Sequence, residues 1–152
     1  MKDLVVLQGG SLNGVIGIPG DKSISHRAVM FGAIADGLTQ VRGCLMGEDV
    51  LATIEAFRSM GVEIDTRDQD CIKFSGVGLL GLRSPNSSIN LGNSGTSMSL
   101  LAGILSGANI DTTLEGDASL SVRPMGRFVC PLRQMGANIE MSGNETPPLR
   151  VK

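Results

Sequence analysis

The feature that most constrains the fold of this chain is an internal repeat. FGAIADG at residues 31–37 returns as LAGILSG at 101–107, and FRSMGVEI at 57–64 returns as LRQMGANI at 132–139. The repeat is roughly 65 to 75 residues long, which is too long for a solenoid unit and suits a module of several strands and helices. The 152 residues therefore hold two copies of one supersecondary unit.

Both copies show the same order of strand, helix, strand, helix, strand, strand. In the first copy, apolar alternation predicts strands at 4–8, 15–19, 39–44, 62–67 and 71–75. Helical spacing and terminal glycines predict helices from Lys22 to Gly37 and from Glu48 to Gly61. The apolar face of the first helix is expected to comprise Ile24, Ala28, Val29, Phe31, Ile34 and Ala35. In the second copy they predict strands at 88–91, 110–115, 138–141 and 149–151, with helices at 95–106 and 124–135. The Gly-, Ser- and Pro-rich residues between the copies predict a connector.

The pattern predicts a mixed α/β (α+β) domain over residues 1–152, built from two βαβαββ units. Their approximate limits are 14–76 and 88–152, with residues 77–87 as the connector. Both helices of each unit carry broad apolar faces, whereas the strands alternate. We therefore expect the helices to pack inside and the sheets to lie outward.

Composition excludes several classes of function. The chain is 41% hydrophobic and 18% charged, which is typical of a globular protein. Its formal net charge of −2 gives no general attraction to nucleic acid or to an anionic membrane. It has no Trp, no Tyr and only four Phe, so the stacking platforms of single-strand binders are missing. Any binding of anions must be local.

The cysteines and the single histidine argue against a zinc site and against a disulfide framework. Cys44, Cys71 and Cys130 are odd in number, widely spaced and without a C-x-x-C pair, and His26 is the only imidazole. Reduced, buried thiols are the expected state. The first residues, MKDLVVLQGG, lack a signal-type cleavage site, and no segment reaches the roughly 18 to 20 apolar residues of a membrane span. A cytoplasmic location is expected.

The start of the first helix, in IPGDKSISHRAVM, carries two positive charges. Ser23 and Ser25 are good capping residues, so Lys22 and Arg27 are expected beside the positive end of the helix. Free N–H groups and two cations suit phosphate or carboxylate, although the P-loop spacing is absent. Taken alone, the two side chains are equally consistent with ordinary solvated charges.

The second copy carries related chemistry at its helix starts. In LGNSGTSM, Asn93 or Ser94 can cap a helix and Gly95 lets a ligand approach the backbone. In SVRPMGR, Pro124 suits the first helical position, which places Arg123 at or beside the cap. Each feature alone could be a plain loop or a surface charge. Their equivalent places in a repeat favour one anion-binding surface, with an acidic helix cap as the default role for Asp49.

Three motifs carry a resemblance to a known family. PGDKSISHRA, LGNSGTSM and GDASLSVRPMGR, in this order and spacing, resemble the N-terminal part of the 5-enolpyruvylshikimate-3-phosphate synthase (3-phosphoshikimate 1-carboxyvinyltransferase) family. The related UDP-N-acetylglucosamine enolpyruvyl transferases lack this lysine-serine-x-x-x-arginine pattern. The resemblance implies an inverse α/β enolpyruvyl transferase-type fold. It also implies transfer of the enolpyruvyl group from phosphoenolpyruvate to the 5-hydroxyl of shikimate 3-phosphate, in aromatic amino-acid biosynthesis, with no metal and no organic cofactor.

Carried over by position, the resemblance assigns roles to six residues. Lys22 would be catalytic and contact both substrates, while Ser23 and Arg27 would hold shikimate 3-phosphate. The phosphoenolpyruvate side, where glyphosate also binds in the family, would comprise Asn93, Gly95 and Arg123 together with Lys22.

The chain departs from the family pattern in two ways. Ser99 stands where the family usually has Arg, so one positive charge is missing. Only two of the six expected units are present, without the domain that brings the family's catalytic Asp, Glu and Lys. The expected partners are small phosphorylated substrates and either a second copy of the chain or a missing partner domain. Three functions stay open: an active transferase, an incomplete anion- or glyphosate-binding module without turnover, and a purely structural fragment.

Overall fold

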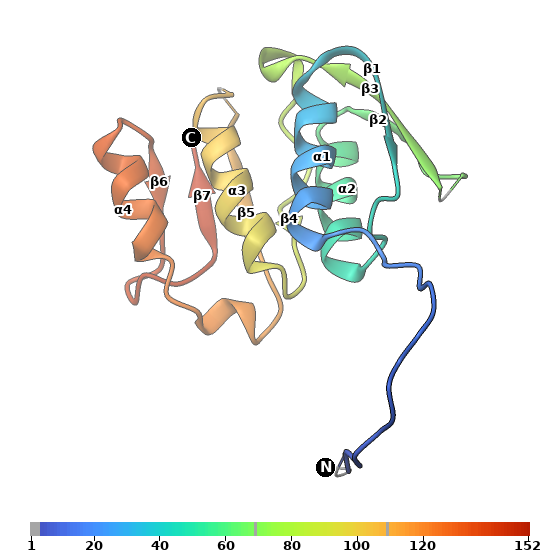
Figure 1. The fold of residues 1–152 in the computed structure, drawn as a ribbon. Helices are drawn as coiled ribbons and strands as arrows, with labels where there is room; N and C mark the ends of the chain where they lie inside the picture. Colours follow the sequence, from blue (N-terminus) through green and yellow to red (C-terminus); the bar gives the residue numbers. More distant parts are fainter. Residues whose placement is uncertain (1–3, 69, 109) are drawn as a thin grey trace.

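The first half of the molecule is a small sheet with two helices packed on it (Figure 1). The computed structural model describes residues 4–68, 70–108 and 110–152. β3 runs between β1 and β2 and is antiparallel to both. The elements in chain order are α1 (Lys22–Ile34), β1 (Asp36–Arg42), α2 (Glu48–Ser59), β2 (Glu63–Asp65) and β3 (Cys71–Val77).

The second half contains the complete βαβαββ order that its sequence predicts. Its sheet has the strand order β4-β5-β7-β6, in which only the β4–β5 pair is parallel. A short 3₁₀ helix, η1 (Leu79–Gly81), precedes this half. Its elements are β4 (Ile89–Asn90), α3 (Gly95–Ser106), β5 (Thr112–Glu115), the 3₁₀ helix η2 (Leu120–Val122), α4 (Gly126–Gln134), β6 (Ile139–Glu140) and β7 (Leu149–Val151).

The two sheets repeat one topology. The order β1-β3-β2 in the first half corresponds to β5-β7-β6 in the second, which is the order that an internal repeat requires. α1 and α2 pack on each other and both contact α3, so helices lie between the two sheets. Buried apolar residues from both halves form one hydrophobic cluster. The predicted fold class, with helices inside and sheets outward, is confirmed.

The expected strands at 4–8 and 15–19 are wrong for this structure. Residues 4–20 are extended without forming a strand, and Met1 to Asp3 lie outside the described residues. Apolar side chains of this segment are exposed, including Val5, Leu12 and Val15. A strand requires a neighbour for its backbone N–H and C=O groups, and no described strand pairs with these residues.

The first helix differs from expectation in its cap, its end and its buried face. Asp21, rather than either serine, caps α1, because its Oδ1 accepts a 2.7 Å hydrogen bond from the Ile24 N–H. The helix ends at Ile34, so Gly37, with φ +96°, lies within β1 instead of after the helix. Ile24 and Phe31, expected on the apolar face, are exposed. The buried face comprises Ser25, His26, Val29, Met30, Gly32 and Ala33.

A glycine lets α1 lie close to its sheet. A Cβ on Gly32 would stand 3.1 Å from the ring of Phe74 on β3. Phe74 is fully buried, so close packing opposes a shift of its ring away from such a Cβ atom. The contact fixes how α1 lies on β3 and, through the helix, where its first turn is held.

The four α-helices of the described residues begin at the same end of the molecule, which is the lower end in Figure 1. β1 and β5 return the chain to that end after α1 and α3, so α2 and α4 start there as well. The first turn of a helix carries unpaired N–H groups and the positive end of the dipole. The fold therefore collects four such ends on one side.

Candidate anion-binding site at the helix N-termini

The residues that the sequence predicts for the site lie at these helix starts. Lys22 and Ser23 are in the first turn of α1, and Gly95 is the first residue of α3. Asn93 precedes the Ser94 N-cap of α3, which the sequence correctly offers as a cap because Ser94 Oγ accepts from the Ser97 N–H. Cationic side chains beside the N–H groups of a helix start are groups that can bind an anion.

Lys22 is paired across helices with Asp49. Its Nζ forms an ion pair with Asp49 Oδ2 in the first turn of α2, and the side chains are 51% and 26% exposed. Asp49 lies in the first turn of α2, as its expected interaction with the helix dipole requires, but it is not the cap: the N-cap is Gly47, and no side-chain hydrogen bond caps α2. The pair borders an open hollow of about 320 Å³, whose lining also includes Leu45, Gly47, Glu48 and Val50. Lys22 is the one cation among the described residues of this lining, and it lies there beside the carboxylates of Glu48 and Asp49.

Arg27 lies one turn after Ser23 on the exposed side of α1. Its Nη1 donates a 3.0 Å hydrogen bond to the Ser23 carbonyl oxygen. The guanidinium is therefore folded back along the helix towards its N-terminus. Ser23 and Arg27 are both exposed, so a ligand at the start of α1 can reach the hydroxyl and the guanidinium together.

Arg123 belongs to a second cluster, at the start of α3. Its Nη2 donates to Asn93 Oδ1 and, at 3.2 Å, to Ser119 Oγ. Asn93 Nδ2 in turn donates to Asp117 Oδ2 at 2.8 Å. A Cβ on Gly95 would lie 3.5 Å from Arg123 Nη1, so the guanidinium lies over the first residue of α3. Asn93, Gly95 and Arg123 are thus brought together.

The placement of Arg123 at the cap of the following helix is wrong. Arg123 ends η2, and α4 begins three residues later with Met125 as its N-cap. The N-terminus of α4 is occupied by the chain itself. Met125 N–H donates to the Glu145 carbonyl oxygen at 2.8 Å, and a Cβ on Gly126 would overlap the Glu145 carboxylate. This end already faces a negative charge.

The carboxylate of Asp117 supports the Asn93–Arg123 cluster. Its Oδ1 accepts a 2.7 Å hydrogen bond from the Leu120 N–H at the start of η2. This bond, followed by the one from the Asn93 amide, holds the pKa of Asp117 below its ordinary value. Asp117 is therefore ionised at neutral pH and acts as a hydrogen-bond acceptor, as expected for a turn or cap residue.

A buried chain of hydroxyl groups lies between the two clusters, and only its Ser94 had been considered from the sequence. His26 Nδ1 is 2.8 Å from Thr53 Oγ1, Thr53 Oγ1 is 2.8 Å from Ser97 Oγ, and Ser97 Oγ is hydrogen-bonded to Ser94 Oγ. The sequence signal was weak. Thr53 falls among the apolar residues of a helix face, where an unpaired hydroxyl would be costly. His26 had been considered only as a possible zinc ligand.

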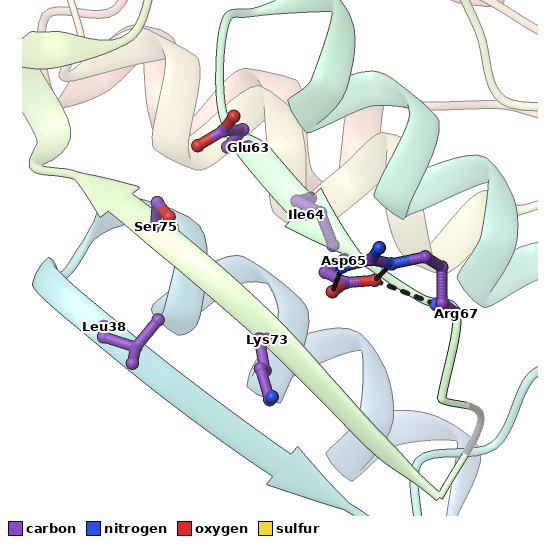
Figure 2. A pocket seen from close by; sticks show the side chains of 7 residues that line it. All are labelled: Leu38, Glu63, Ile64, Asp65, Arg67, Lys73 and Ser75. Carbon is purple, nitrogen blue, oxygen red and sulfur yellow. Dashed lines mark hydrogen bonds and ion pairs between the residues drawn. The ribbon is translucent and has the colours of Figure 1, made fainter.

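Another hollow lies elsewhere, on the sheet face opposite the helices of the first half (Figure 2). Its volume is about 410 Å³, and it is lined by Leu38, Glu63, Ile64, Asp65, Arg67, Lys73 and Ser75. Arg67 binds both carboxylate oxygens of Asp65, and these hydrogen bonds hold the pKa of Asp65 well below its ordinary value. The hollow pairs charges of both signs and lies apart from the helix starts.

The described residues show neither a metal site nor a membrane-spanning helix. No group of three or more His, Cys, Asp or Glu side chains among them is arranged to hold a metal ion. None of their helices combines the length and the apolar character that crossing a bilayer demands.

Comparison with known proteins identifies the family. The model of the EPSP synthase (3-phosphoshikimate 1-carboxyvinyltransferase) family matches residues 6–152. The 3-phosphoshikimate 1-carboxyvinyltransferase of Alkalilimnicola ehrlichii is 56% identical over 147 residues, which are 97% of this chain and 33% of that protein. That of Halorhodospira halophila is 56% identical over 146 residues, or 96% and 33%.

A solved structure agrees with these relatives. EPSP synthase from Acinetobacter baumannii superposes with a TM-score of 0.87 at 53% identity, over 91% of this chain and 32% of that one. The chain spans about a third of the length of the relatives it matches. Over almost all of its own length, this chain belongs to the EPSP synthase (3-phosphoshikimate 1-carboxyvinyltransferase) family.

Proposed function

We propose that this chain supplies the first part of the active site of a transferase that moves the enolpyruvyl group of phosphoenolpyruvate to the 5-hydroxyl of shikimate 3-phosphate. The observation that carries the proposal is the gathering of Lys22, Gly95 and Arg123 at helix N-termini on one side of the fold. Both substrates carry phosphate and carboxylate groups, which such a surface suits.

In this proposal the two clusters hold different substrates. Ser23 and Arg27 bind shikimate 3-phosphate at the start of α1, and Asn93, Gly95 and Arg123 bind phosphoenolpyruvate at the start of α3. Lys22, the one residue proposed to be catalytic, contacts both. An arriving dianion competes with Asp49 for the Lys22 ammonium and with Asn93 for the Arg123 guanidinium. Each exchange replaces an internal partner by a ligand oxygen of higher charge.

The missing arginine at position 99 weakens the second cluster in this proposal. Ser99 Oγ donates a 3.1 Å hydrogen bond to the Thr96 carbonyl oxygen and contributes no charge. Phosphoenolpyruvate then depends on Arg123 and on the N–H groups at the start of α3. We expect Ser99→Arg to strengthen its binding, as measured by calorimetry.

The second candidate function is an anion- or glyphosate-binding module without turnover of its own. The state of the two carboxylates favours it, because Asp49 is paired with Lys22 and the pKa of Asp117 is lowered. Because its pKa is lowered, Asp117 is ionised at neutral pH and is not suited to donate a proton to a reacting carbon. A phosphate-release assay with both substrates, over a range of protein concentrations, separates the two functions. Release that rises more steeply than protein concentration supports assembly of an active site from several chains.

The organisation of the chain forms part of the same proposal. We take residues 14–76 and 88–152 as two structural units joined by residues 77–87. Exposed Ile24 and Phe31 support a further partner, either a second copy or a partner domain. Sedimentation over a concentration series tests self-association, and a single monomeric species throughout would exclude it. Three free cysteines support a reducing, cytoplasmic setting.

The direct test is calorimetry on the intact chain with each substrate and with glyphosate. Lys22→Ala is the test variant, and Lys73→Ala is the matched control, because Lys73 lies on the outward face of β3. The proposal requires that only the first substitution weakens binding. Absence of binding to the parent chain at millimolar ligand would remove both candidate functions.

A further inference from the structure

Buried polar side chains connect three helices in the interior. His26 on α1, Thr53 on α2 and Ser97 on α3 are each 0% exposed, and Ser94 is 1% exposed. Their hydrogen bonds run in series from His26 to Thr53, then to Ser97 and finally to the Ser94 N-cap of α3. Burying polar groups is costly unless each is paired, so such a chain does not arise from hydrophobic packing alone.

The two ends of this chain lie beside the two clusters of the anion site. His26 is one helical turn after Lys22, and Thr53 is one turn after Asp49. Thr53 Oγ1 and Ser97 Oγ also lie 3.2 Å and 3.4 Å from the Asp49 carbonyl oxygen. At the other end, Ser94 is the neighbour of Asn93, the residue that accepts from Arg123.

Hydrogen bonds and apolar contacts constrain helices differently. A hydrogen bond loses strength steeply with distance and angle, whereas apolar surfaces can slide while keeping much of their contact. The Thr53–Ser97 bond joins the second turn of α2 to the first turn of α3, so it fixes the relative height of the two helices near the end that carries the site. Networks of this kind specify one arrangement of a core.

We propose that His26, Thr53 and Ser97 are positioning residues, and that their buried chain holds the Lys22–Asp49 pair and the Asn93–Arg123 cluster at the separation that two adjoining anionic ligands require. The statement that the two clusters bind adjoining ligands rests on the proposed function. The statement that the buried chain holds the helix starts in place does not. None of the three side chains contacts a ligand: they act through the helices that carry the clusters.

The His26 ring is suited to anchor the chain. Burial lowers its pKa and outweighs the opposite effect of Asp49, and the charges of Lys22 and Arg27 lower it further. The ring is therefore neutral at physiological pH, and Nδ1 can accept from the Thr53 hydroxyl. In the other tautomer Nδ1 donates to Thr53 Oγ1, whose own hydroxyl then donates to the Asp49 carbonyl oxygen. The hydrogen bond between His26 and Thr53 is present in either tautomer. His26 Nε2 has no partner among the described residues.

Ser97→Ala removes the hydroxyl that links Thr53 to Ser94 and so interrupts the chain between the two clusters. Thr53 keeps His26 as its partner, and Ser94 Oγ loses one contact but continues to face the backbone N–H of residue 97. Alanine is the best helix former, so α3 is retained. Ser97→Thr restores a hydroxyl and serves as the rescue variant. Thr112→Val is the control, because Thr112 is buried on β5 and its Oγ1 has no described partner.

The first readout needs no ligand. Amide hydrogen exchange at residues 95–98 and 22–25, followed by NMR in the whole chain, reports whether the starts of α1 and α3 are held. We expect exchange at residues 95–98 to rise at least tenfold in Ser97→Ala, to recover in Ser97→Thr and to stay unchanged in Thr112→Val. Unchanged exchange in Ser97→Ala would overturn the proposal whether or not the chain binds substrates.

The second readout is the coupling between ligands. We expect the affinity for phosphoenolpyruvate measured in the presence of shikimate 3-phosphate to fall at least fivefold in Ser97→Ala, with a smaller change for either ligand alone. If the affinity for phosphoenolpyruvate falls equally with and without shikimate 3-phosphate, the defect is local to α3. That result would contradict a role in holding the two clusters at a fixed separation. If the parent chain binds neither ligand, the proposed function falls, while the exchange result still decides the mechanical role.

Discussion

Lys22 Nζ and Asp49 Oδ2 form an ion pair between the first turns of α1 and α2. In the proposed site, the Asp49 carboxylate occupies the position at Lys22 where an oxygen of an incoming anion would bind. Because Lys22 is half exposed, the pair contributes at most about 1 kcal/mol to folding. The relationship therefore matters more for ligand binding than for stability.

Asp49→Asn is expected to strengthen the binding of a small dianion. The substitution removes a negative charge beside Lys22 but keeps a side chain of the same shape. We expect affinity for phosphoenolpyruvate to rise by up to about fivefold, which corresponds to about 1 kcal/mol. Titration calorimetry of both proteins at one ionic strength checks this. Weaker binding in the variant would mean that Asp49 orients Lys22 instead of competing for it.

His26 gives the protein a specific dependence of stability on pH. Its pKa is lowered by burial, so between its folded pKa and its ordinary value of 6.5 the unfolded chain binds a proton that the folded chain does not. Stability is therefore complete above pH 6.5 and declines as the pH falls below it, by at most about 1.4 kcal/mol per pH unit.

Urea unfolding at pH 7.5, 6.5 and 5.5 measures this decline, and His26→Asn should flatten it. The lowered carboxyl pKa values of Asp111 and Asp117 also make stability fall with decreasing pH, but they act in a more acidic window than His26. Their contribution is present above their ordinary value of 3.8 and is lost only as the pH falls further. A decline between pH 6.5 and 5.5 that persists in His26→Asn would assign it to another group.

Gly95→Ala is expected to weaken ligand binding without lowering the stability of the fold. A Cβ at this position would lie 3.5 Å from Arg123 Nη1 and 3.7 Å from Leu120 Cδ1, which are ordinary contacts. Alanine also favours a helix by roughly 0.8 to 1 kcal/mol over glycine, so stability should hold or rise. The methyl group stands where a ligand would approach the first turn of α3. We expect phosphoenolpyruvate to bind at least tenfold more weakly by calorimetry, and unchanged affinity would remove Gly95 from the site.

The fold was largely predictable because the repeat and the helix ends are encoded locally. Gly61 and Gly136, with φ of +92° and +102°, follow α2 and α4 as expected for C-terminal glycines. Pairing of the segments at 4–8 and 15–19 depends on a neighbouring strand, which local pattern cannot supply. The buried face of α1 was misjudged because Ile24 and Phe31 are as apolar as the residues that pack on β3.

The sequence predicted which residues lie at the helix starts, but it predicted their positions and hydrogen-bond partners less well. Arg123 was expected at α4, but the Asp117 side chain accepts from Leu120 N–H and forms the extra turn η2 before Pro124. The partner of Lys22 lies on another helix, so the spacing along the chain carries no sign of it. The same holds for the buried hydroxyl chain, whose members are brought together only by helix packing.

The central claim is that Lys22 and Arg123 bind ligand anions and are not merely solvated surface charges. The most direct measurement is calorimetry of phosphoenolpyruvate and shikimate 3-phosphate on the parent chain, Lys22→Ala, Arg123→Ala and the control Lys73→Ala, with thermal unfolding of each. A charge-assisted hydrogen bond contributes about 1.5 to 3 kcal/mol, so the first two variants should bind roughly tenfold or more weakly with little change in unfolding temperature. Lys73→Ala should bind as the parent does. If Lys22→Ala and Arg123→Ala bind like the parent, the cations at the helix starts hold no ligand and the account is wrong.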